Sequence, residues 1–260
     1  MIFAEVGLNH NGSRSYASKY INFHKKTNFD ILTFQIREPN FYKRKEKRHL
    51  KLPKSFYKNL SKIYKKKLFG DCGVSLSSIQ TFNEIKSFKF NYYKILSMAA
   101  NNEELIKKIL KETTSKIYIS CGLMSFKELI NIVNRYEKNK RIKFIYTQLS
   151  YKKSDLNLIN FFYLSKKYPN KFAYGHHYTN KLPIYLIQSK ENIDLFIYIK
   201  GDKKIRHPDE KHALNFKNFD RLLREIKDIK TLIGIKKNLS GKNTIPDQNR
   251  WKKKLKKVLF

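Results

Sequence analysis

The stretch IFAEV at residues 2–6, followed by the polar loop GLNHNGS at residues 7–13, sets the pattern that decides the fold. Seven further short apolar runs, rich in β-branched and aromatic residues, follow it along the chain, at residues 31–36, 73–76, 93–96, 117–120, 144–148, 172–174 and 195–199. Longer stretches with helical periodicity separate these runs. The alternation predicts an α/β protein built from eight strand–helix units with parallel strands.

Closure of these strands into a (β/α)₈ TIM barrel is the architecture that we expect. A chain of 260 residues has the usual size of one such barrel. An open doubly wound sheet is the alternative, and it loses support because no G-x-G-x-x-G or P-loop motif follows the first run. We expect the barrel to occupy residues 1–235 and a basic C-terminal tail to occupy residues 236–260.

Helix boundaries are marked by a few residues of strong capping preference. Asn102, Ser125 and Asp155 are the expected N-caps of helices at residues 103–112, 126–137 and 156–167. The basic, aromatic segment at residues 43–67 predicts an exposed loop in its first half and a helix in its second half.

The formal net charge of +35 comes mainly from lysine, since the 56 basic residues comprise 46 Lys and ten Arg. Lysine occurs in nearly every expected helix, so the positive charge is better explained by a general bias in amino-acid composition. The alternative is a selected surface, formed by residues 43–67 and the tail, that binds polyanions. On the first explanation, nucleic acid is not an expected partner.

No run approaches the ~20 apolar residues of a membrane span. We expect a cytoplasmic protein in which Cys72 and Cys121 are reduced, buried thiols.

Polar residues at the ends of the expected strands are the candidates for chemistry, because active sites of such barrels lie at the C-terminal ends of the strands. Hydroxyl groups and a lysine on several strands can hold a phosphate or a carboxylate. Lys94 follows two tyrosines in an apolar run and should be buried, where either a bound anion or an internal acid would balance its charge. Of the adjacent His176 and His177, one should be structural, and the other is a candidate metal ligand.

Seven short motifs, in order, resemble segments of the sialic acid synthase family. The first three are FAEVGLNHNGS at residues 3–13, TFQ at residues 33–35, which is similar to the family's K-F-Q, and YKI at residues 93–95 followed by Ser97. The later four are ISCGLMSFKEL at residues 119–129, LSYKKSDLNL at 149–158, YGHHYT at 174–179 and HPDEKHAL at 207–214. The resemblance covers nearly the whole chain and implies the same barrel.

The resemblance implies a reaction in which phosphoenolpyruvate condenses with an N-acylated amino sugar aldehyde to give a nonulosonic acid for surface glycans. A divalent metal, Mn²⁺ or Mg²⁺, would polarise the aldehyde. The residues that match the family's functional positions are Glu5 as the catalytic acid, His177 as the metal ligand, and Ser75, Lys94, Ser97, Ser120, Tyr151 and Asp209 as substrate contacts.

Four positions depart from the family's pattern. Thr33 stands where the family has a phosphate-binding lysine, Ala99 where it has an acid, Gly175 where it has a serine, and Tyr198 where it has the second metal-binding histidine. We expect the metal to be weakly bound or lost, with Glu5, His10 and Asp209 as the candidates for a replacement ligand. The family's C-terminal antifreeze-like domain, which covers a partner subunit's site, is not expected within these residues.

Three functions remain open from the sequence. The first is an active condensing synthase, which could act as a homodimer. The second is a sialic-acid-synthase-like barrel that has lost catalysis and serves as a partner or binding module. The third is a basic polyanion-binding protein built on a barrel, which only the charge favours.

Overall fold

A computed structural model of the chain describes residues 1–190, 193–202 and 205–233. The eight expected strands are all present. They are β1 (Ile2–Gly7), β2 (Ile31–Gln35), β3 (Asp71–Leu76), β4 (Tyr92–Ile95), β5 (Lys116–Ser120), β6 (Ile142–Thr147), β7 (Phe172–His176) and β8 (Asp194–Lys200). Each strand pairs in parallel with its neighbour in sequence.

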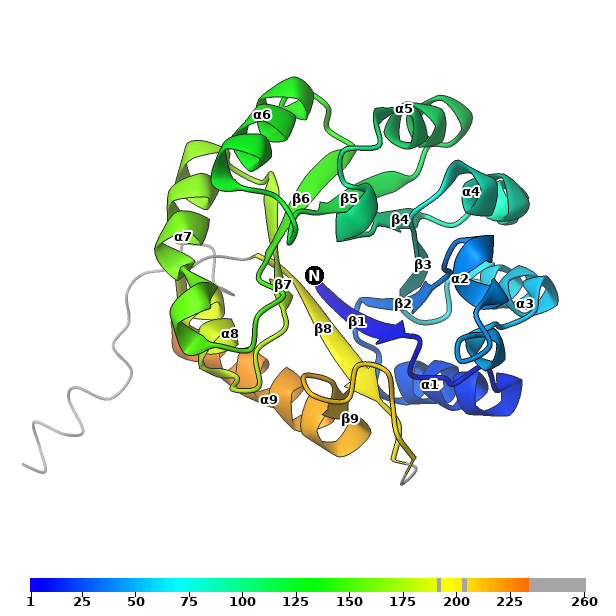
Figure 1. Cartoon of the computed structure of the whole chain (residues 1–260). Coiled ribbons are helices and arrows are strands. Elements are labelled where there is room, and N and C mark those ends of the chain that lie inside the picture. The colour runs from blue at the N-terminus through cyan, green and yellow to red at the C-terminus, as the bar shows by residue number, and fades with distance from the viewer. Residues whose placement is uncertain (191–192, 203–204, 234–260) are drawn as a thin grey trace, which may run out of the picture.

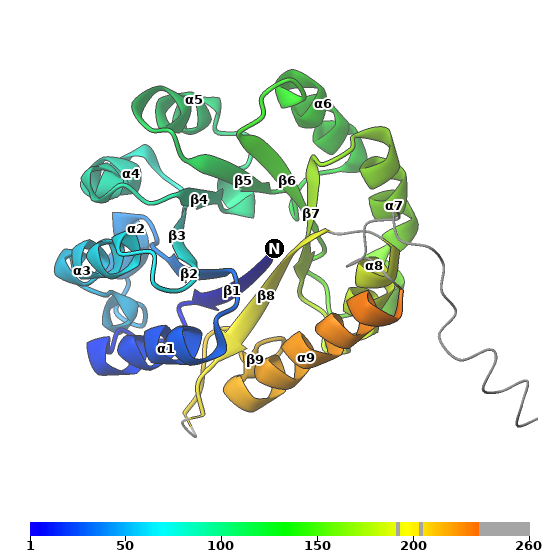
Figure 2. The ribbon, with the colours of Figure 1, turned by 180° about the vertical axis from the view of Figure 1, so that it is seen from behind.

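The sheet is closed, because β1 also pairs in parallel with β8, with Ile2 opposite Leu195 and Glu5 opposite Tyr198. Figure 1 looks along the barrel and shows the ring of strands inside a ring of helices; Figure 2 shows the same ring from behind. The prediction of a (β/α)₈ barrel is therefore confirmed, and the open-sheet alternative is wrong.

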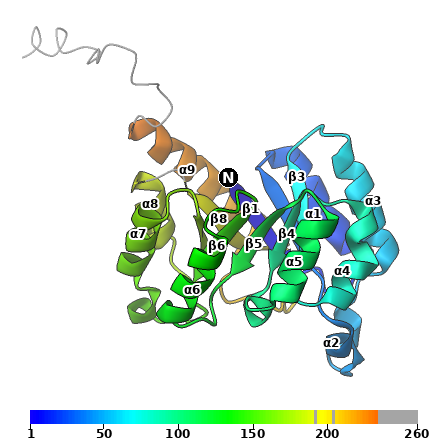
Figure 3. The same cartoon turned by 90° about the horizontal axis from the view of Figure 1, so that it is seen from above.

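Helices follow the strands and cover the outside of the barrel. The α-helices are α1 (Arg14–Thr27), α2 (Pro39–Lys43), α3 (Lys54–Lys65), α4 (Ile79–Ile85), α5 (Glu103–Glu112), α6 (Phe126–Tyr136), α7 (Leu158–Lys167), α8 (Leu182–Lys190) and α9 (Phe216–Leu232). Short 3₁₀ helices are η1 (Arg48–Leu50), η2 (Lys86–Phe88), η3 (Ser97–Ala99) and η4 (Lys153–Leu156). In the side view of Figure 3, α2 projects beyond the rest of the barrel at one end.

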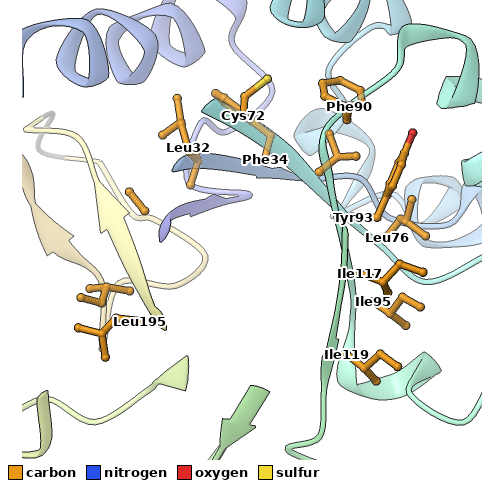
Figure 4. Packing of buried hydrophobic residues seen from close by; sticks show 14 of the residues in the cluster. Leu32, Phe34, Cys72, Leu76, Phe90, Tyr93, Ile95, Ile117, Ile119 and Leu195 are labelled. Carbon is orange, nitrogen blue, oxygen red and sulfur yellow. The ribbon is translucent and has the colours of Figure 1, made fainter. Parts of the chain in front are cut away.

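Two apolar cores follow from the alternation of side chains along each strand. Residues on the outer face, such as Leu32, Val74 and Ile95, pack against the helices in the large cluster that Figure 4 shows in part. Residues on the inner face fill the barrel, where Phe3 stacks on Phe196 with ring centroids 4.1 Å apart. Both cysteines are free and buried, as expected.

The structure corrects one expected helix start and adds a short strand. Asp155 does not cap α7, because it lies within η4, and α7 begins after Asn157, whose left-handed backbone (φ 42°) separates the two helices. The expected caps Asn102 and Ser125 are confirmed. A two-residue strand, β9 (Leu214–Asn215), pairs with β8 and was not predicted.

The basic segment at residues 43–67 has the expected organisation, since an irregular stretch containing η1 leads into α3. The expected tail at residues 236–260 lies outside the described residues. Within the described part of the chain, no helix is both long enough and apolar enough to cross a membrane.

Candidate functional site

A layer of polar side chains lies above the apolar filling of the barrel, towards the C-terminal ends of the strands. Two residues beyond Phe3 on β1 comes Glu5, and two residues beyond Tyr92 on β4 comes Lys94, so both face inward. Ser75 on β3 is the register partner of Lys94. The side chains of Glu5, Ser75 and Lys94 are all buried.

Lys94 and Glu5 reach across the barrel to each other. The Nζ atom of Lys94 lies 2.5 Å from Oε1 of Glu5, and both side chains are at most 5% exposed. The ammonium group also lies 5.3 Å from the ring centre of Phe196 and 5.6 Å from that of Tyr198. The sequence left open whether a bound anion or an internal acid balances the charge of Lys94, and the structure provides the internal acid, Glu5. The side chain of Lys94 points into the barrel and not into the helix layer.

Further hydroxyl groups lie at the same ends of the strands. Ser97, at the start of η3, and Ser120, the last residue of β5, share a hydrogen bond of 2.9 Å between their Oγ atoms. Thr33 and Thr147 also lie on the inner face, and their buried Oγ1 atoms have no hydrogen-bond partner among the described residues. These hydroxyls are donors that an anionic ligand could use.

Asp209 enters the site from the loop after β8. Its backbone N–H donates to Oδ1 of Asn9, whose Nδ2 donates to the carbonyl of Ile199, so buried Asn9 fixes this loop against the barrel. The carboxyl group lies over Gly7, where a Cβ atom would come within 2.5 Å of Oδ2. Gly7 has φ +56°, so the end of β1 needs glycine for both its conformation and this close approach. Burial and the charge of Glu5 raise the pKa of Asp209 to about 7.

The predicted metal ligand His177 follows β7 and lies beside two other rings. Its ring centre is 5.2 Å from that of Tyr198 and 4.5 Å from that of His212. Burial lowers the pKa of His177 well below its usual value and that of His212 to about 4, and the charge of Lys94 adds to both shifts. Both imidazoles are therefore neutral near pH 7, which is the form that binds metals.

The replacement ligands expected from the sequence do not turn to His177. Glu5 is paired with Lys94, and Nδ1 of His10 accepts a hydrogen bond from the backbone of Gly12. Asp209 lies against Gly7 and Tyr198. Residues 1–190, 193–202 and 205–233 contain no group of three or more His, Cys, Asp or Glu side chains arranged to hold a metal ion.

Tyr151 and His176, both singled out from the sequence, differ in burial. Tyr151 is 43% exposed at the rim, and its nearest polar contact is His212, with its hydroxyl 3.4 Å from Nδ1. His176, the neighbour of His177, is buried within β7, which fits the expected structural role of one of the two histidines.

His212 is the residue of the site that sequence reasoning missed. It lies in the segment HPDEKHAL, from which only Asp209 was selected. Its Nε2 atom is buried and has no hydrogen-bond partner within the described part of the chain. The one available signal was a histidine in a loop after the last strand, and the parallel pairing of β7 with β8 brings that loop beside the end of β7.

The chain is similar in sequence to two pseudaminic acid synthases. Over 257 residues, the chain is 25% identical to the pseudaminic acid synthase of Campylobacter jejuni subsp. jejuni serotype O:2, covering 90% of this chain and 74% of that protein. The same figures hold for the pseudaminic acid synthase of the serotype O:23/36 strain.

Solved structures share the fold at lower sequence identity. An N-acetylneuraminic acid synthetase from Leptospira borgpetersenii, solved with citrate, superposes with a TM-score of 0.79 at 20% identity, covering 99% of this chain and 90% of that one. A truncated 3-deoxy-D-arabino-heptulosonate 7-phosphate synthase from Thermotoga maritima gives a TM-score of 0.68 at 14% identity, covering 90% of this chain and 87% of that one. The model of the NeuB family matches residues 17–238, and the chain therefore belongs to the NeuB family.

Proposed function

We propose that this protein condenses phosphoenolpyruvate with an N-acylated amino sugar aldehyde to form a sialic-acid-like nonulosonic acid. The observation that carries the proposal is the polar layer at the C-terminal ends of the strands, in which Glu5, Lys94 and Ser120 are buried and Ser97 is half-buried. In a NeuB-family barrel, this layer offers one lysine and several hydroxyl groups to a substrate with a phosphate and a carboxylate. The two pseudaminic acid synthases among its relatives support the same class of product.

The proposed reaction forms one C–C bond and breaks one C–O bond. C3 of phosphoenolpyruvate attacks the aldehyde carbon, and the aldehyde oxygen takes up a proton to become a hydroxyl group. Water adds to the cationic C2 and loses a proton. The bond between C2 and the phosphate oxygen then breaks as the new C2 hydroxyl gives up its proton to the departing phosphate, which leaves a ketone at C2 and inorganic phosphate.

Each residue of the layer has a defined part in this proposal. Lys94 would face the anionic groups of phosphoenolpyruvate, with Glu5 fixing its position through the 2.5 Å ion pair. Ser75, Ser97 and Ser120 would donate hydrogen bonds that orient the phosphate and the carboxylate.

Asp209 is the side chain that we assign to proton transfer at the aldehyde oxygen. A carboxyl group with a pKa of about 7 is partly protonated at neutral pH and can both donate and accept a proton. A divalent ion, when bound, would polarise the aldehyde, and His177 is its proposed ligand. Tyr151, which lies at the rim, would contact the sugar and not the phosphate.

A non-catalytic barrel is the second candidate, and Tyr198 is the observation that favours it. Its ring packs against His177 at the position that the resemblance assigns to a second metal-binding histidine. Thr33 removes a positive charge from the same layer. A barrel of this kind would keep the fold and lose phosphoenolpyruvate turnover.

Phosphorus NMR distinguishes the two candidates. Phosphoenolpyruvate labelled with heavy oxygen in its bridging position is incubated with the protein, N-acetylmannosamine or its diacetamido analogue, and Mn²⁺. A synthase releases labelled phosphate only when an aldehyde sugar is present, since the C–O bond breaks. Absence of phosphate release with every sugar, from protein shown to be folded, would favour the non-catalytic barrel.

A further inference from the structure

A small cavity lies between the loops that follow β5 and β6. Its volume is about 230 Å³, and its lining residues come from the ends of these two strands and from the beginnings of α6 and α7. Cys121, which lines it, comes directly after Ser120, and Gln148, which also lines it, comes three residues before Tyr151. The cavity therefore borders two segments that carry proposed substrate contacts.

The lining of this cavity is uncharged. None of its ten residues is acidic or basic, although charged residues make up 30% of the chain. Met124, Phe126 and Leu129 supply apolar surface. A phosphate or carboxylate group would lose water here without meeting a counter-charge, which is unfavourable. The cavity therefore suits a neutral group that is partly apolar.

Two half-buried side-chain amides, those of Gln148 and Asn160, add polar groups to the lining. Nε2 of Gln148 donates to the hydroxyl of Tyr146 at 3.3 Å, and that hydroxyl donates to the carbonyl of Asn157 at 3.0 Å. Within the described part of the chain, no hydrogen bond occupies Oε1 of Gln148 or the side-chain amide of Asn160. One acceptor and one N–H donor are therefore available to a ligand that carries an amide.

We propose that this cavity holds the N-acyl group of the amino sugar. The N–H of the acylamino group donates to Oε1 of Gln148, and Nδ2 of Asn160 donates to the acyl carbonyl. The acyl carbon chain packs against Met124, Phe126 and Leu129. A volume of about 230 Å³ lies below the roughly 300–1,000 Å³ of pockets that enclose a whole ligand, so the cavity fits a substituent and not the sugar ring. This inference rests on the proposed function, because it assigns a place to one part of that sugar.

Saturation-transfer difference NMR with N-acetylmannosamine, in the absence of phosphoenolpyruvate, tests the assignment without turnover. The acetyl methyl protons should receive more saturation than the ring protons, because the methyl group is enclosed by apolar side chains. Gln148→Leu and Asn160→Leu should each weaken sugar binding about two- to tenfold, since each removes one hydrogen bond. Gln80→Leu, at an exposed glutamine of α4, is the matched control and should bind the sugar as the wild type does.

Asn160→Ala guards against misfolding caused by the added apolar bulk, and circular dichroism establishes that each variant is folded. Wild-type affinity in Gln148→Leu and in both Asn160 variants would overturn the inference. Absence of sugar binding to the wild type, or saturation confined to the ring protons, would overturn it as well.

Two further outcomes separate this inference from the proposed function. Sugar binding through the acetyl group, without phosphate release from phosphoenolpyruvate, would keep the inference and remove the proposed function. Turnover with the same KM for the sugar in the wild type and in the Gln148 and Asn160 variants would do the reverse.

Discussion

Glu5 and Lys94 depend on each other, since both side chains are buried and form one ion pair inside the barrel. Removing one member of such a pair leaves a buried charge without a partner, which costs about 3–5 kcal/mol. Lys94→Met should therefore destabilise the protein by about that amount. The double variant Glu5→Gln/Lys94→Met should recover most of the loss, because it leaves no buried charge at either position.

Urea unfolding of the wild type, both single variants and the double variant measures this coupling as a double-mutant cycle. Additive losses in the double variant would show that the two side chains do not depend on each other.

Burial of Lys94 was predictable from its apolar run, but its partner was not. The two residues are 89 positions apart, and only closure between β1 and β8 fixes where Glu5 points.

His24 of α1 should make stability depend on pH. Burial lowers its pKa to about 4, while its two ring nitrogens contact the hydroxyl of Tyr64 and the carbonyl of Phe29. The unfolded chain binds a proton near pH 6.5, whereas the folded chain does not. The stability from neutral His24 is therefore fully present above pH ~6.5 and is lost as pH falls towards 4.

The variant His24→Gln, which can form hydrogen bonds but does not titrate in this range, isolates the effect. Between pH 6.5 and 4, its free energy of unfolding should fall by about 3 kcal/mol less than that of the wild type. Chemical unfolding at a series of pH values measures both curves. Parallel curves would contradict this assignment.

The helix α6 begins with a complete capping box, in which Ser125 and Glu128 bond to each other's backbone N–H groups. Ser125→Ala should lower stability by about 1 kcal/mol. Asp155→Ala is the matched control, because Asp155 lies in η4 and caps no helix, and it should change stability by less than about 0.5 kcal/mol. Thermal unfolding measures both variants, and an equal loss in the two would refute the assignment of the caps.

Element types were predictable from the sequence where burial sets the pattern. All eight strands are buried by helices outside and by side chains inside, so their apolar runs stand out. The start of α7 was not predictable, because η4 and the left-handed Asn157 interrupt the segment locally. His212 was missed for a different reason: its neighbour His177 comes from another loop, and the pairing of β7 with β8 sets the proximity of the two loops.

The positive charge is spread around the whole barrel. Exposed lysines lie on helices on every side of it, for example Lys19, Lys62, Lys107, Lys127, Lys166 and Lys227. This distribution favours compositional bias and predicts that no single stripe dominates binding to polyanions.

Heparin binding at several salt concentrations measures this distribution. Two variants each change four exposed lysines to Gln, one at Lys54, Lys58, Lys62 and Lys65 on α3, the other at Lys107, Lys111, Lys127 and Lys166 on three other helices. Both should lose similar affinity and salt dependence. A much larger loss in the α3 variant would show a selected surface in the basic segment.

The proposed function depends on whether the polar mouth of the barrel binds phosphoenolpyruvate. Isothermal titration with phosphoenolpyruvate, with and without Mn²⁺, should give one saturable site per chain. Ser120→Ala should weaken binding about tenfold or more, since a hydrogen bond to a charged group contributes about 1.5–3 kcal/mol. Ser18→Ala, on the exposed face of α1, should leave binding unchanged. No binding by the folded wild type in either condition, or equal binding by the wild type and Ser120→Ala, would contradict the account.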